Sequence, residues 1–238
     1  MRGAGYSLLL ALFAIGKACA EPVQLQYFDL PPFSFEHEGQ PSGYALALAL
    51  SITAGLDIVV HTELVPLRRL NFEAEKAPII VAAIVRNEER EPLYLWIGKL
   101  CTDAYLMVSR APAQPVNNLE EARHLKSIAV MAGAWNEIYL RRGGLTNLDP
   151  ASSLQLEVRR LAEGHDDAWF ASRNAAIHAW KEAGHDPAQL RFGTPIAPMA
   201  VWMAASRSVP DEMVKTLRAR FAAKVHDGTV AAVTKCPN

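Results

Sequence analysis

The sequence lacks several features that would each point to a different class of protein. Its 24 basic side chains stand against 25 acidic ones, a net charge of −1, so a nucleic-acid-binding surface is not expected. After Ala20 no apolar run reaches the roughly 20 residues of a membrane span. The motifs HExxH and G-x-S-x-G and a nucleotide-binding glycine loop are also missing. Enzymes defined by these motifs are therefore not predicted.

The first twenty residues have the three parts of a secretory signal peptide. Arg2 supplies a positive charge, residues 7–15 are apolar, and Ala18 and Ala20 are the small residues before a cleavage site. We predict cleavage after Ala20 and export, to the periplasm for a bacterial chain. A membrane anchor is disfavoured by the short apolar run, and lipid attachment at Cys19 ranks third.

Cysteine is scarce, and cleavage would leave only Cys101 and Cys236. In an oxidising compartment such a pair often forms a disulfide. Two unpaired buried thiols are an equally weighted alternative, because spacing does not show whether the Cα atoms lie within bridging distance.

Strand and helix patterns alternate along the first half of the chain. Predicted strands cover 23–28, 56–64 and 79–85; predicted helices cover 42–54, with Ser42 as a candidate cap, and 66–75. Residues 36–42 form a polar turn, a candidate hairpin tip. This order predicts an α/β fold with a mainly parallel sheet and helices on both faces.

The pattern begins again after residues 111–115, a segment with two prolines. Predicted helices then cover 119–123, 133–142, 152–163, 174–183 and 211–225; strands cover 127–131 and 166–170, and an extended segment follows at 194–205. The sequence therefore predicts two α/β lobes.

Charged residues follow the buried strand 79–85. In open α/β sheets, ligands bind just outside the carboxyl ends of the strands. Arg90 would grip a carboxylate there with two parallel hydrogen bonds, which lysine cannot do. The alternative, slightly favoured on this stretch alone, is a solvated helix start where Glu88, Glu89 and Glu91 pair with the arginines.

Five motifs follow one another in a familiar order and spacing. They are Pro31-Pro32-Phe33 with Gly43-Tyr44, the block Arg86 to Leu100, Leu119-Glu120 ahead of Gly133, the segment Gly164 to Trp169, and Asp227-Gly228-Thr229. Together they resemble the family 3 extracytoplasmic solute-binding proteins, the amino-acid-binding class that serves ABC importers. The resemblance covers nearly the whole chain after Ala20.

The resemblance implies a two-lobed, type II periplasmic-binding-protein fold with two hinge strands. Lobe 1 would contain 21–110 and 196–238, and lobe 2 would contain 111–195. A small ligand would be enclosed when the lobes close. The implied partners are a permease and its ATPase, and we expect a monomer with no cofactor and no metal.

The resemblance also implies ligand-binding residues. Arg90 would bind the carboxylate of an amino acid and Asp167 its ammonium, with Asp166 as a substitute. Phe33 would form an apolar wall for the side chain of the ligand, with ordinary core packing as the alternative role. Trp135 lies near the start of a helix, where backbone N–H groups suit an anion. Asn87 stands where the family has threonine, and Ala134 and Trp135 replace hydroxyl residues. These departures count more against the prediction of an amino-acid ligand than against the prediction of a binding protein.

Two other classes remain as alternatives. A dehydratase-like periplasmic enzyme on the same fold would use an acid–base cluster such as His165-Asp166-Asp167. His37 lies between two glutamates, a short pattern that belongs to a polar loop far more often than to a metal site. A ligand-sensing protein usually needs a membrane span and an output domain, and the sequence supplies neither pattern.

Overall fold

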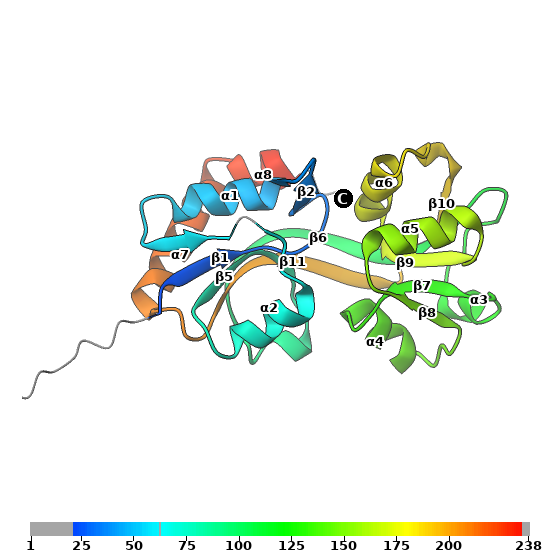
Figure 1. Ribbon diagram of the computed structural model, residues 1–238, viewed down its shortest axis with the longest axis horizontal. Helices are drawn as coiled ribbons and strands as arrows, with labels where there is room; N and C mark the ends of the chain where they lie inside the picture. Colours follow the sequence, from blue (N-terminus) through cyan, green and yellow to red (C-terminus); the bar gives the residue numbers. More distant parts are fainter. Residues whose placement is uncertain (1–20, 62, 235–238) are drawn as a thin grey trace, which may run out of the picture.

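The computed structural model describes residues 21–61 and 63–234, which form two lobes side by side (Figure 1). The predicted signal peptide and Cys236 lie outside the described residues. Within these ranges no helix has the length and apolar character needed to cross a membrane. The same ranges contain no group of three His, Cys, Asp or Glu side chains that could hold a metal ion.

Lobe 1 places three parallel strands between two layers of helices. The strands are, in spatial order, β4 (Ile58–Val60), β1 (Val23–Gln26) and β5 (Ile79–Val85). One face is covered by α1 (Tyr44–Thr53), α7 (Asp211–His226) and α8 (Thr229–Thr234), and the other by α2 (Leu67–Ala74). Both faces of β5 are therefore buried, with Ile80 on the α1 side and Ile79 and Val81 on the α2 side.

Lobe 2 repeats this layered arrangement. β7 (Ile128–Met131) pairs in parallel with β8 (Leu148–Ala151) and β9 (Ala168–Ser172). One core contains residues of α5 (Leu154–Glu163) and α6 (Arg173–Glu182), and the other contains residues of α3 (Leu119–Arg123) and α4 (Trp135–Arg142). A short 3-10 helix, η2 (Pro187–Gln189), leads into β10 (Leu190–Phe192).

Two long strands join the lobes. β6 (Tyr94–Arg110) and β11 (Ala197–Ser206) pair antiparallel; β11 also pairs with β5 in lobe 1, and β6 with β9 and β10 in lobe 2. Figure 1 shows both strands running from one lobe to the other. This arrangement confirms the predicted α/β fold class with two hinge strands. The boundaries at 110/111 and 195/196 stay a prediction, because the strands cross without a break.

The start of α1 differs from the prediction. Ser42 ends β3 (Gln40–Ser42), which forms a hairpin with β2 (Phe35–His37), and Gly43 is the N-cap residue with no side-chain cap. Gly43 has φ of 113°, and a Cβ there would lie 2.4 Å from the Phe33 carbonyl oxygen. Glycine is therefore needed for the hairpin to meet the helix.

The β-prone residues 101–109 belong to the longer strand β6, and β8, β10 and α8 were not predicted. Cys101, on β6, is disulfide-bonded. Its predicted pairing with Cys236 stays a prediction.

We predict that Gly98→Ala destabilises the protein. A Cβ at Gly98 would lie 2.1 Å from a ring carbon of Phe221, the α7 residue that packs on β6. Overpacking of this kind costs about 1–3 kcal/mol of unfolding free energy, which urea unfolding measures. Combining Gly98→Ala with Phe221→Leu should recover part of the loss; a strictly additive double variant would contradict the steric explanation.

Candidate ligand-binding site

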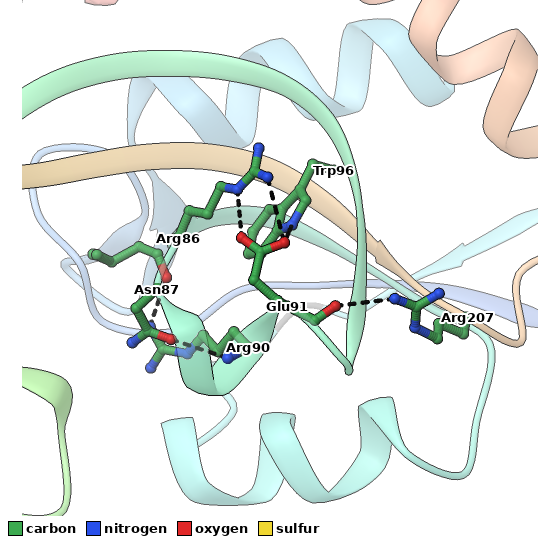
Figure 2. Close-up of polar contacts among 7 residues, drawn as sticks. Arg86, Asn87, Arg90, Glu91, Trp96 and Arg207 are labelled. Carbon is green, nitrogen blue, oxygen red and sulfur yellow. Dashed lines mark hydrogen bonds and ion pairs between the residues drawn. The ribbon is translucent and has the colours of Figure 1, made fainter.

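The site is built around the turn that follows β5. The side chain of Asn87 accepts a hydrogen bond from Arg90 N at 3.0 Å and so caps the 3-10 helix η1 (Glu88–Arg90). The Arg90 side chain then folds back, and its Nη1 donates to the Val85 carbonyl at 2.7 Å (Figure 2). Arg90 is only 6% exposed. The turn therefore buries a guanidinium at the carboxyl end of a central strand.

The other arginine of this turn lies at the surface. Arg86 Nε donates to Glu91 at 2.7 Å, and Trp96 Nε1 donates to the same carboxylate at 3.0 Å (Figure 2). The Arg86 guanidinium also lies over the rings of Trp96 and Trp202. The surface-pair interpretation therefore describes Arg86 and Glu91 but not Arg90.

A cavity of about 100 Å³ lies between the lobes and is open to Arg90. It lies at the carboxyl ends of four strands, because residues that end or follow β1, β5, β7 and β9 line it. These are Phe28, Val85, Met131 and Ser172. Lobe 2 adds Trp135 and Asn136 at the start of α4 and Glu157 from α5. The cavity is thus at the position that an open α/β sheet favours for a ligand.

Arg90 has no acidic partner in the described part of the chain. Its one side-chain hydrogen bond to protein there is the bond to Val85, and no carboxylate there lies within 4.0 Å of its guanidinium. Burial lowers the pKa of Arg90, yet an arginine stays charged in proteins. A buried cation with free donors beside a cavity is suited to an anionic ligand, above all to a carboxylate.

Acidic groups line the same cavity. Burial and the charge of Glu36 raise the pKa of Asp29 to about 6. Glu157 is 1% exposed, and its Oε1 has no hydrogen-bond partner. Burial holds the pKa of Glu157 well above its usual value, and the charge of Asp29 adds to this. The cavity therefore combines one buried cation with two carboxyl groups that resist ionisation.

Aromatic rings form much of the remaining wall. Tyr105 of β6 contacts Trp135 and Phe170, with ring centroids 5.5 and 5.4 Å apart, and all three residues line the cavity. Burial raises the pKa of the Tyr105 hydroxyl to about 12, so the group is a neutral donor near Arg90. The wall suits a ligand with apolar surface between its polar ends.

Contacts between the lobes flank the cavity. Phe35 of β2 meets His178 of α6 with ring centroids 4.4 Å apart, and His37 lies 3.2 Å from Glu182. Elsewhere Glu89 of η1 pairs with Arg142 of α4 at 3.0 Å. These pairs connect lobe 1 to lobe 2 outside the cavity.

The structure brings only some of the predicted site residues together. Arg90 and Trp135 line the cavity. Asn87 supports Arg90 by capping its turn. Phe33 is fully buried in the lobe 1 core, where its ring packs 5.0 Å from that of Tyr44, so it is not part of the cavity wall.

Asp166 and Asp167, which were expected to take the ammonium of the ligand, do not line the cavity that Arg90 lines. Asp167 accepts a hydrogen bond from Lys126 N at 2.6 Å, and Asp166 accepts one from the Ser127 hydroxyl. Both precede β9, whereas the cavity is at its carboxyl end. A five-residue strand separates those ends by roughly 16 Å.

One backbone N–H of the expected anion site near the start of α4 already has an acceptor. Glu137 accepts a hydrogen bond from Gly133 N at 2.6 Å. Sequence reasoning missed Asp29, Tyr105 and Glu157. Asp29 directly follows the first strand, so the strand-end rule would have selected it, whereas Glu157 resembles the other charged residues of its helix.

Neither a protein-family model nor a curated protein matches this sequence. Solved structures match the fold over 90% of the chain, each with a TM-score of 0.75. One is a mutant of ArgBP from T. maritima, at 17% identity over 93% of that chain. Another, at 13% identity over 91%, is an ABC uptake transporter substrate-binding protein from Streptococcus pneumoniae with bound histidine. A third is a histidine kinase sensor domain with similarity to periplasmic binding proteins, at 19% identity. At these identities the likeness establishes the fold alone.

We predict that Asp29→Asn stabilises the protein at neutral pH. The folded-state pKa of about 6 exceeds the usual 3.8, so ionising Asp29 costs stability as the pH rises through this interval. The gain in unfolding free energy should be about 1–3 kcal/mol near pH 7.5 and close to zero near pH 4. Urea unfolding at the two pH values tests this; an equal effect at both would contradict it.

Proposed function

We propose that this protein binds a small carboxylate-bearing solute, with an amino acid as the leading class, in the cavity between its lobes. The supporting observation is the buried Arg90 guanidinium, which has donors facing the cavity and no carboxylate partner among the described residues. A ligand carboxylate would supply the missing charge through two parallel hydrogen bonds.

We further propose that the protein works in the periplasm, as a monomer, and delivers its ligand to a permease and ATPase of the ABC type. The fold shared with the substrate-binding protein from S. pneumoniae supports this role. Binding and closure of the lobes would then be its whole activity, with no chemical step.

Ligand sensing is the second candidate function. It is supported by the equally similar fold of a histidine kinase sensor domain. The two roles share the same binding chemistry and differ in the partner that contacts the closed lobes. Capture of either a permease or a sensor protein by the ligand-loaded form would separate them.

We predict that Arg90→Ala abolishes the thermal stabilisation that a bound ligand gives. Amino acids and small organic acids would be screened by thermal shift, because a ligand that binds only the native state raises the unfolding temperature. Compounds active with the wild type should lose the effect with Arg90→Ala, since no other described cation lines the cavity.

Arg86→Ala is the matched control. It removes an arginine from the same turn, but one that pairs with Glu91 outside the cavity. This variant should keep the full ligand-induced shift. An unchanged shift with Arg90→Ala, or an equal loss with Arg86→Ala, would reject the site.

A further inference from the structure

Glu157 is a buried carboxyl group that the carboxylate-binding role of Arg90 does not use. It lies on α5 of lobe 2 and lines the same cavity as Arg90 of lobe 1. It is 1% exposed, and its Oε1 has no hydrogen-bond partner. An unsatisfied buried oxygen carries a free-energy cost, which a ligand donor would remove.

The groups around Glu157 come from several elements. The Trp169 indole on β9 donates a hydrogen bond to the carboxyl group, and Arg160 on α5 also favours its charged form. Asp29 and Asp166 oppose ionisation, and the Tyr105 hydroxyl of β6 lies near enough to sense the charge. Arg160 is itself paired with Asp149 at 2.9 Å. Burial prevails, so the pKa of Glu157 stays well above its usual value.

We propose that Glu157 receives the ammonium group of a ligand whose carboxylate is held by Arg90, and that it releases its own proton when it does so. The ligand class of this cavity is then a zwitterion with an amine and a carboxylate. This inference rests on the proposed function, since it concerns the same site and requires Arg90 to bind the carboxylate.

The proton balance of the step is simple. In the empty protein, burial favours the carboxylic acid form of Glu157. When the ligand enters, the O–H bond breaks, the proton leaves to solvent, and the carboxylate accepts an N–H from the ammonium. An ammonium has three donors, and the Asp29 carboxyl group lines the same cavity as a second acceptor. One ligand therefore enters for about one proton released.

A purely structural Glu157 would behave differently. A neutral carboxylic acid that only fills the core would be indifferent to an amine on the ligand. The two roles are separated by comparing ligands that differ only in this group.

The experiment uses the full-length purified protein and pairs of ligands. Alanine with propionate, phenylalanine with 3-phenylpropionate, and glutamate with glutarate each keep the carbon skeleton and differ in the ammonium. Calorimetry or thermal shift gives the affinities for the wild type and for Glu157→Gln, which keeps the shape of the side chain. The wild type should prefer the amino acid of a pair. Glu157→Gln should weaken that amino acid by about 10- to 100-fold and leave its deaminated partner unchanged.

The pH dependence supplies a second readout. Wild-type affinity for the amino acid should rise with pH over the range in which Glu157 of the empty protein loses its proton, and calorimetry in buffers of different ionisation enthalpy should detect proton release. Glu157→Gln should have a flat profile there. Glu163→Gln is the matched control, because it removes an exposed carboxyl group of the same helix that does not line the cavity, so the pH dependence of the affinity should stay as in the wild type.

The outcomes distinguish this inference from the proposed function. If the wild type prefers the deaminated acids, or if Glu157→Gln weakens both members of a pair equally, the role of Glu157 is rejected while Arg90 still binds carboxylates. If Arg90→Ala leaves all affinities unchanged, the proposed function itself fails. Urea unfolding of Glu157→Gln verifies that the variant is folded, and Glu157→Asp, which restores the carboxylate, should regain part of the amino-acid preference.

Discussion

A buried guanidinium that has no carboxylate partner among the described residues is the constraint on which this structure depends. Desolvating a cation is costly, and the cost is offset only when an anion and further hydrogen bonds accompany it. In the described part of the chain the Arg90 side chain has one hydrogen-bond acceptor, the Val85 carbonyl. The neighbouring Arg86, by contrast, has a carboxylate and two aromatic rings. The same turn therefore gives Arg86 an acidic partner and leaves Arg90 without one among the described residues.

The fold makes this arrangement stable by placing it where several rigid elements end. β5 is buried along its whole length and fixes the position of Val85. The Asn87 cap fixes the turn. The strand β6 runs from lobe 1 into lobe 2, and its residue Tyr105 lines the cavity. The cavity is thus formed by strand ends and a crossing strand, which hold side chains more firmly than a loop would.

The sequence was informative where one local rule decided the outcome. Periodicity located most of the strands and helices, including Leu119–Arg123, and the strand-end rule located Arg90. It failed where position along a strand mattered. Asp167 and Ser172 lie at opposite ends of β9, and the strand-end rule, had it been applied to this strand too, favours the end at Ser172. Glu157 was missed for another reason: nothing in its helix pattern distinguishes a buried glutamate from the exposed charges beside it.

Whether a ligand favours closure of the lobes depends on which lobe supplies each of its contacts. A ligand shifts an equilibrium between open and closed lobes only by its difference in affinity for the two states. A solute held by Arg90 alone would bind lobe 1 equally well in either state and would not favour closure. The cavity walls, however, come from both lobes, with Asp29 and Arg90 from lobe 1 and Trp135 and Glu157 from lobe 2. Contacts to the second lobe exist only when the lobes meet. Under the proposed function, the polar and aromatic groups of lobe 2 would therefore determine which carboxylates close the protein, while Arg90 would determine only that a carboxylate enters.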